Sequence, residues 1–326
     1  MELQDKFAIF KESNLLKTEK IVFLDLCHWY RLLEEKRYER LMRTLTSQVE
    51  DGKVICPVSF SIINEFQKHK DKDLVLKRIR FADRLSKRFA IIHYRRLPRI
   101  EFVKYSNDSC ALEKYDALTH WFDFFPEELR FEQNGATDEQ YDVLCSQLLA
   151  MSPDIWLKYD EFWRMTETLD KEVYGRLRSL VNDGHYIGKG RKLIEKEEMD
   201  FLIDLLLSEL IAIKNFKAEE LDAIRNFHEK TAKTSEGRRS FFRNLPSLFM
   251  RSKINTSLRY DKKTVKVNDF WDLEHAMALP YSHIYVTDKP TAHTLKNTLK
   301  LESKFGVSIL NSLDDLEFFI NNVDVN

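Results

Sequence analysis

Acidic side chains stand at the ends of short apolar segments, where a fold could bring them together. Asp25 follows the run KIVFL, Glu65 lies in a helix-like stretch after the run KVICPVS, and Asp288 follows the run HIYVT. Carboxylates within about 5 Å of one another repel, so such a cluster would either raise its pKa values or bind a cation. Hard oxygen ligands favour Mg²⁺ or Mn²⁺, which assist phosphodiester hydrolysis by activating a water and stabilising the leaving oxygen.

Two further acids, Asp269 and Asp272, open the helix-like segment that precedes Asp288. Asp269 is better placed as an N-cap and Asp272 lies better against the sequence HAMA, so both stay candidates for one acidic position. Each acid also has a structural alternative. In this alternative, Glu65 is a solvated helix residue and Asp288 is an acid in a turn. Either Asp269 or Asp272 is then an N-cap that contributes about 1 kcal/mol. Four carboxylates at matched positions are harder to explain in this way than any one of them.

Two histidines accompany these acids. His28 follows Asp25 by three residues, and His275 follows Asp272 by three. Either imidazole could contact a metal-bound water, although a lone histidine is more often packed or hydrogen-bonded.

The elements that would position these side chains are strands and helices in alternation. Residues 20–26 form a continuous β-prone run typical of a buried parallel strand, and residues 29–52 predict a helix that stops at Gly52. A second short strand and a helix begun by Ser59 or Ser61 follow. This order predicts βαβ units, and ligands collect at the carboxyl ends of parallel strands. We therefore expect the acids to converge on one pocket.

The remainder of the chain divides by pattern. Residues 89–94 predict either a third strand or a helix end, and residues 101–264 predict helices almost throughout. The alternation then resumes with one helix over TAHTLKNTLKLESKFG that ends at Gly306. It finishes with the strand VSIL and a helix capped by Ser312. We expect residues 20–100 and 265–326 to build one split α/β domain, with residues 101–264 as a helical insertion or subdomain.

Composition indicates a globular protein of the reducing cytoplasm. The 326 residues are 43% hydrophobic and include only 8 Gly, which favours a sizeable core and long helices. The four cysteines are far apart and suggest neither a zinc ribbon nor a disulfide framework. The most apolar stretch, residues 201–213, is too short to span a membrane and is expected to be a buried helix.

Charge is segregated along the chain. Residues 68–101 contain 12 Lys and Arg against 4 Asp and Glu, and residues 228–266 contain 11 against 3, so each segment has a net charge of +8. Residues 102–174 have a net charge of −10. The basic segments could bind a polyanion, or they could pair with the acidic one.

The second basic segment interleaves aromatic and basic side chains. They are Phe241, Phe242, Phe249, Arg238, Arg239, Arg243 and Arg251. Base stacking with phosphate contacts would use this mixture, but a helix with a buried Phe stripe and exposed arginines uses it equally well. The candidate nucleic-acid contacts are Arg238, Arg239 and Arg243 here, with Arg78 and Arg80 in the first basic segment.

Several of these segments together resemble the PIN-domain nucleases. They are VFLDL, CPVSFSIINEF, NDFWDLEHAMALPYSHIYVTDK and FGVSIL, within residues 20–95 and 265–322. The resemblance implies an α/β fold: a three-layer α/β/α sandwich with a parallel sheet, here with a large, mostly helical insertion. It also implies three or four acidic residues that bind Mg²⁺ or Mn²⁺ and cleave single-stranded RNA or structured nucleic acid. Many members are toxin or defence ribonucleases.

The function we expect is a metal-dependent endonuclease acting on RNA, with an inhibitory or complex partner protein. The expected metal ligands are Asp25, Glu65, Asp272 and Asp288, and Asp269 competes with Asp272. One alternative is a structure-specific DNA nuclease whose insertion clamps the strand. Another is a PIN-like binding or scaffold subunit whose helical middle makes protein contacts.

Overall fold

The chain divides into two compact units, each of which combines segments far apart in the sequence. The computed structural model describes residues 11, 19–93, 96–121, 189–211, 218–231, 234–261 and 275–322. The first unit comprises residues 1–93, 114–163 and 281–326, and the second comprises residues 94–113 and 164–280. The N-terminal and C-terminal segments, in which the sequence predicted alternating strands and helices, therefore both contribute to the first unit.

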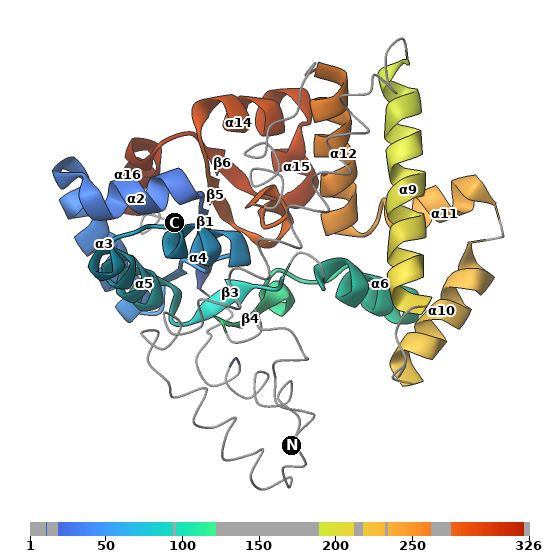
Figure 1. Ribbon diagram of the computed structural model, residues 1–326, viewed down its shortest axis with the longest axis horizontal. Coiled ribbons are helices and arrows are strands. Elements are labelled where there is room, and N and C mark those ends of the chain that lie inside the picture. Colours follow the sequence, from blue (N-terminus) through green and yellow to red (C-terminus); the bar gives the residue numbers. More distant parts are fainter. Residues whose placement is uncertain are drawn as a thin grey trace, which may run out of the picture. The chain divides into compact units, whose positions relative to one another are not determined.

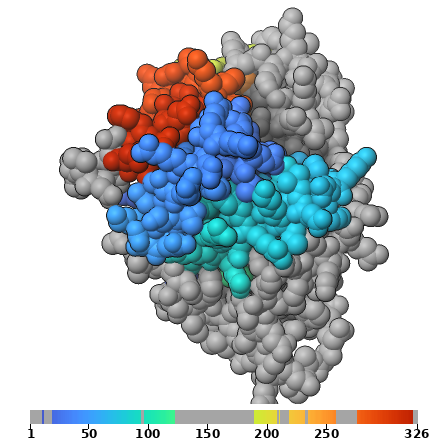
Figure 2. Space-filling model, turned by 90° about the vertical axis from the view of Figure 1, so that its left-hand side faces the viewer, coloured from blue at the N-terminus to red at the C-terminus, as the bar shows by residue number. Residues whose placement is uncertain are grey.

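A four-stranded parallel sheet organises the first unit. Its strands are β1 (Lys20–Leu24), β2 (Val54–Ile55), β5 (Ile284–Val286) and β6 (Ser308–Leu310), in the order β2-β1-β5-β6. All three pairings are parallel, with Leu24 opposite Val286 between β1 and β5. The prediction of a mixed α/β fold with a parallel sheet is confirmed, and the N-terminal and C-terminal elements share one face in Figure 2.

The central strands are buried on both faces, as a continuous apolar run predicts. Residues 21–24 of β1 are fully buried, and so are Tyr285 and Val286 of β5. The rings of Phe23 and Tyr285, which are neighbours in the register, stack with their centroids 5.4 Å apart. Apolar cross-strand pairs of this kind stabilise the β1–β5 pairing that holds the two ends of the chain together.

Helices connect β1 to β2 and follow β2 (Figure 1). They are α2 (Leu26–Glu34), the 3₁₀ helix η1 (Lys36–Tyr38), α3 (Glu39–Glu50), α4 (Phe60–Gln67) and α5 (Lys72–Ser86). The single helix predicted for residues 29–52 is wrong, because the extended backbone of Glu35 separates α2 from η1 and α3. The predicted stop is confirmed, since Gly52 has a φ of 68°. The Ser59 hydroxyl caps α4 by accepting from the N–H of Ile62.

The second βαβ unit joins β5 to β6 through three short helices. They are α14 (Lys289–His293), the π-helix η7 (Thr294–Thr298) and α15 (Leu301–Phe305), and α16 (Leu313–Asn322) follows β6. The predicted helix end at Gly306 and the predicted cap at Ser312 are confirmed by a φ of 58° and by a hydrogen bond from the N–H of Asp315. Lys300, at a φ of 53°, divides what the pattern predicted as one helix.

A two-stranded antiparallel sheet also belongs to the first unit. It pairs β3 (Phe89–Ile91) with β4 (Leu118–His120), which follows the 3₁₀ helix η2 (Tyr115–Ala117). The run that predicted either a strand or a helix end is therefore a strand. The prediction of helix almost throughout residues 101–264 is wrong at β4, because the partner that makes this segment a strand lies some 30 residues earlier in the chain.

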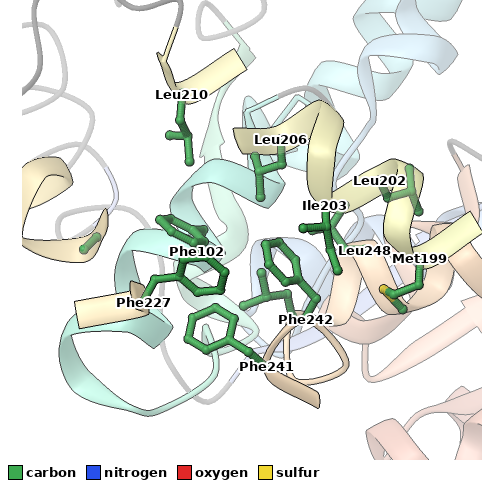
Figure 3. Packing of buried hydrophobic residues seen from close by; sticks show 12 residues of the cluster. Phe102, Met199, Leu202, Ile203, Leu206, Leu210, Phe227, Phe241, Phe242 and Leu248 are labelled. Carbon is green, nitrogen blue, oxygen red and sulfur yellow. The ribbon is translucent and has the colours of Figure 1, made fainter. Parts of the chain in front are cut away.

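The described part of the second unit is mainly helical. Its helices are α6 (Leu97–Asp108), α9 (Arg191–Ile211), α10 (Ala218–Lys230), α11 (Ser235–Phe242) and α12 (Pro246–Asp261), and η6 (Leu279–Tyr281) precedes β5. Phenylalanine rings from α6, α10 and α11 point toward one another at the centre of the core (Figure 3). Leu202, Ile203 and Leu206 of α9 complete this cluster. Within the described ranges, no helix has the length and apolar composition needed to cross a membrane.

Candidate functional site

Asp25 and Asp288 lie at the carboxyl ends of two adjacent parallel strands. Asp25 is the first residue after β1, and its N–H donates to the carbonyl of Val286 at 2.9 Å. Thr287 continues the ladder from β5 by donating its N–H to the carbonyl of Leu310, and Asp288 follows. Because neighbouring parallel strands end at the same edge of a sheet, both carboxylates belong to the edge where ligands collect in α/β folds.

The Asp25 carboxylate is held on both of its oxygens. Oδ1 accepts from the N–H of Leu26 at 2.6 Å and so caps α2, and Oδ2 accepts from the hydroxyl of Thr287 at 3.0 Å. Asp25 is 9% exposed and Thr287 is fully buried. The hydroxyl therefore links the ends of β1 and β5 through side chains, next to their backbone ladder. Thr287 was not among the predicted site residues, although its place before Asp288 in the run VTD was a signal.

Asp288 has a capping role of its own. It is exposed, and its Oδ1 accepts from the N–H of Thr291 at 2.7 Å, which begins α14. The reading of Asp288 as a structural turn acid is therefore compatible with the structure, as is a ligand role for its second oxygen.

His28 is buried beside the same two acids. It lies one turn into α2 and is fully buried. Burial lowers the pKa of His28, against smaller opposing effects of the Thr287 backbone and of the charges of Asp25 and Asp288. Because its pKa is lowered, the His28 imidazole is neutral at neutral pH. The charges of Asp25 and Asp288 both act on this ring, so the two carboxylates lie near the same buried side chain.

Glu65 lies on α4 and contacts other side chains. Its carboxylate pairs with Lys68 one turn later on the same helix. Burial raises the pKa of Tyr30, and the charge of Glu65 adds to this rise while that of Arg78 opposes it. The helix α4 places Glu65 after β2, the strand next to β1, with its carboxylate toward Tyr30 and Lys68.

Asp269 and Asp272, the two candidates for the third acidic position, lie outside the described residues. Within the described ranges, no group of three or more His, Cys, Asp and Glu side chains is arranged to hold a metal ion. The described donors at the sheet edge are therefore Asp25, Asp288 and the hydroxyl of Thr287.

The two predicted arginine contacts on α5 differ in exposure. Arg78 is 7% exposed, donates to Glu34 Oε1 at 2.6 Å and stacks over the ring of Tyr30 at 4.2 Å. Arg80 lies on the exposed face of the same helix. Arg78 therefore packs α5 against α2, and only Arg80 of the two presents its side chain to solvent.

The arginines of α11 are largely engaged with carboxylates. Arg239 is 6% exposed and donates to both oxygens of Asp200 at 3.0 Å and to Glu236 at 3.1 Å. Arg243 also pairs with Glu236, at 3.0 Å, and Arg238 is half-buried. Of these three side chains, Arg239 connects α11 to α9 through its hydrogen bonds to Asp200.

The phenylalanines of α11 are core residues. Phe241 is 7% exposed and Phe242 is fully buried, and both rings contact Phe102 and Phe227 with centroids 4.9–6.1 Å apart. Rings packed in this way cannot stack on bases. The structure therefore shows the buried Phe stripe of the alternative reading at Phe241 and Phe242, but Arg239 is buried with them and not exposed.

The chain matches no protein-family model, no curated protein and no solved structure. The functional conclusion therefore depends on the residues at the sheet edge.

Proposed function

We propose that this chain is a PIN-like, metal-dependent endonuclease that hydrolyses phosphodiester bonds in RNA. The observation that carries the proposal is the placement of Asp25 and Asp288 at the ends of the adjacent parallel strands β1 and β5. The hydroxyl of Thr287, the residue before Asp288, donates to the Asp25 carboxylate and so links the two strand ends. Residues 262 positions apart thus supply neighbouring groups at the sheet edge that binds ligands in α/β folds.

The donor chemistry of this edge suits Mg²⁺ or Mn²⁺. Carboxylate and hydroxyl oxygens are hard ligands, and the imidazole of His28, on which the charges of both acids act, is buried. A bound divalent ion supplies a water of lowered pKa and stabilises the leaving oxygen. Asp25 and Asp288 would hold it, with Glu65 and either Asp269 or Asp272 as the further acids.

The residues around Asp25 fix its orientation. The N–H of Leu26 holds Oδ1 and the hydroxyl of Thr287 holds Oδ2, so the carboxylate has one orientation before any ligand arrives. A carboxylate oxygen has two lone pairs, so accepting one hydrogen bond does not prevent it from binding a metal ion. Pre-orientation of this kind reduces the entropy lost on binding and aligns the attacking water with the phosphate.

The finer architecture we propose is a three-layer α/β/α sandwich of PIN-like type. Full burial of both faces of β1 supports it, because helices or loops must then cover the sheet on each side. The helical second unit would be the insertion.

Metal-dependent cleavage is the test of this function. We would incubate the full chain with labelled single-stranded RNA, single-stranded DNA and duplexes, each with Mg²⁺, Mn²⁺ or EDTA. We expect cleavage of single-stranded RNA that EDTA abolishes, and a fall on the order of 100-fold or more in Asp25→Asn and Asp288→Asn. Asn caps helices as well as Asp does, so each variant removes a charge and keeps the cap.

Asp71→Asn is the matched control for these variants. Asp71 caps α5 by accepting from the N–H groups of Asp73 and Leu74, away from the ends of β1 and β5. Its substitution removes the same charge from another N-cap and should leave cleavage unchanged. Equal loss in all three variants, or cleavage that persists in EDTA, would contradict the proposal.

A binding or scaffold subunit is the second candidate, and one observation favours it. Asp25 and Asp288 each cap a helix, which is a structural role that needs no metal. Titration of the full chain with Mn²⁺, followed by calorimetry, separates the two. Binding that Asp25→Asn and Asp288→Asn both weaken supports the nuclease, and no binding supports the scaffold.

A further inference from the structure

Three basic side chains lie near the amino ends of the parallel strands, the sheet edge opposite the two acids. Lys20 is the first residue of β1, His283 directly precedes β5, and Lys114 directly precedes η2. We refer to these three residues as the amino-edge cluster. His283 donates its N–H to the carbonyl of Ile21 at 2.8 Å, so the backbone holds the beginnings of β1 and β5 together.

The ammonium group of Lys114 reaches the beginnings of two strands. Its Nζ donates to the carbonyl of Ser282 at 2.6 Å and to that of Gly306 at 2.9 Å, just before β5 and β6. An ammonium has three N–H groups, so one more is left for a ligand. Burial and the charge of Lys20 lower the pKa of Lys114, which means that the two lysines are near enough to repel each other.

The imidazole of His283 adds a neutral hydrogen-bond donor beside these lysines. Its Nδ1 accepts from the N–H of Ile21 at 3.0 Å, and the ring of Tyr115 lies beside it with the centroids 5.7 Å apart. Burial and the charges of Lys114 and Lys20 lower its pKa to about 4. The ring is therefore neutral at pH 7, and because Nδ1 accepts, its proton is on Nε2.

The acids of neighbouring segments have other basic partners. They are Glu19, Asp116 and Glu302, which pair with Lys87, Lys11 and Lys296 at 2.7, 3.7 and 3.2 Å, respectively. In the part of the chain that the structure describes, no acid pairs with a member of the amino-edge cluster. Like charges brought together without an acid repel, and a bound anion would offset that repulsion.

Lys114 has a structural role as well, whereas Lys20 has none that the described residues show. Gly306 ends α15, so Lys114 satisfies a carbonyl at a helix end. The side chain of Lys20 is exposed and makes no hydrogen bond or ion pair with a described residue. A change at Lys20 therefore removes a positive charge from the cluster and leaves the contacts between the strands in place.

We infer that the amino-edge cluster binds a phosphate group with two negative charges, either inorganic phosphate or the phosphate of a nucleoside monophosphate. Such a group carries about −1.5 to −2 at pH 7, which matches two ammonium charges. Its oxygens also accept from the Nε2–H of His283. A phosphodiester has one negative charge and a carboxylate has two oxygens, so both match the cluster less well. The cluster contains none of the acids of the proposed nuclease site and is a second site.

Phosphate binding by the full chain in EDTA tests the inference. We would titrate the parent and Lys20→Gln by calorimetry, at constant ionic strength, with inorganic phosphate, adenosine monophosphate, adenosine and acetate. Both phosphates should bind, adenosine and acetate should bind at least about 10-fold more weakly, and Lys20→Gln should lower phosphate affinity about 10-fold. Lys20→Arg keeps the charge and should retain most of the affinity. Tighter binding of the nucleotide than of inorganic phosphate would identify the nucleotide as the ligand.

The matched control is Lys289→Gln, which removes the same charge at the opposite end of β5. Lys289 is also exposed and directly follows Asp288. Its variant should bind phosphate as the parent does. Equal weakening in Lys20→Gln and Lys289→Gln would overturn the inference, because it would show an effect of net charge alone. Acetate binding as tight as phosphate binding would overturn it too.

The titration of His283 supplies a readout that a folding defect does not reproduce. A nearby anion favours the charged imidazole, so saturating phosphate should raise the pKa of His283 above its value of about 4. NMR spectra between pH 4 and 7 measure this rise, with the resonance assigned through its loss in His283→Asn. An unchanged pKa at saturating phosphate would contradict binding at the cluster.

The result does not depend on cleavage, because EDTA removes divalent ions. Phosphate binding that Lys20→Gln weakens, in a chain that cleaves no RNA, would leave this inference standing and refute the proposed function. Cleavage by a chain that binds no phosphate would do the reverse.

Discussion

The ends of β1 and β5 in the first unit and helix α11 in the second were both predicted to be functional, and their structures differ. At the strand ends, Asp25 and Asp288 follow adjacent strands, as their positions in the pattern implied. In α11, Phe242 and Arg239 are buried in the core of the second unit, and Arg239 pairs there with Asp200. The strand-end prediction used position within a fold, whereas the α11 prediction used residue composition, which does not distinguish a surface from a core.

The largest effect that would test this contrast is on the stability of the second unit. Phe242→Ala should lower the free energy of unfolding by about 3–5 kcal/mol, because it removes a fully buried ring from a packed cluster. Phe201→Ala on α9 is the matched control, since that ring is 43% exposed and should cost far less. Equal losses measured by urea unfolding would mean that α11 does not pack as described.

The arginines of α11 provide a smaller test. Arg239→Gln should destabilise the protein by about 2 kcal/mol, because it removes bonds from a buried guanidinium to Asp200 and Glu236. Arg243→Gln breaks an exposed pair and should cost less than about 0.5 kcal/mol. If Arg243→Gln lowered RNA affinity while Arg239→Gln left stability unchanged, the results would favour α11 as a nucleic-acid-binding surface.

His283, which lies just before β5, should make the free energy of unfolding depend on pH. Burial, together with the charges of Lys114 and Lys20, lowers the pKa of His283 to about 4, and its Nδ1 accepts from the N–H of Ile21 at 3.0 Å. The unfolded chain, with a pKa near 6.5, therefore binds this proton first. The stability is complete above pH 6.5 and falls as the pH drops toward 4. Because the ring is partly exposed, we expect a loss of about 1–2 kcal/mol.

His283→Asn should remove this pH dependence, because the amide oxygen can still accept from Ile21 but does not titrate. His69→Asn is the control. The exposed ring of His69 also accepts a backbone N–H, from Asp71, at 3.1 Å. Denaturant unfolding at several pH values measures both variants, and a pH profile unchanged in His283→Asn would contradict the assignment.

The smallest effect concerns the link between β1 and β5. Thr287→Val preserves the shape of the side chain and removes the hydroxyl that donates to Asp25, so it should cost about 1 kcal/mol. If the link orients Asp25, metal affinity should fall as well, and Thr287→Ser should restore it. A valine variant that loses stability but keeps its metal affinity would limit Thr287 to a structural role.

The sequence predicted the elements whose signals are local. A continuous apolar run predicted β1, and the glycines and serines at helix ends predicted the stops at Gly52 and Gly306 and the cap at Ser312. Partners far away in sequence decided the rest. Burial of Arg78 depends on Glu34, which is 44 residues away, and burial of Arg239 depends on Asp200, which is 39 residues away. The strand β4 likewise depends on β3.

The pairing of β1 with β5 has a consequence for how the protein is made. Asp25 and Thr287 are 262 residues apart, so the acidic edge cannot form until most of the chain has left the ribosome. Until then the apolar face and edge of β1 have no β5 to cover them, and contacts of such long sequence separation form slowly. A nascent or truncated chain would thus lack the acidic edge and be prone to aggregation, which makes chaperone dependence during synthesis an expected property of this fold.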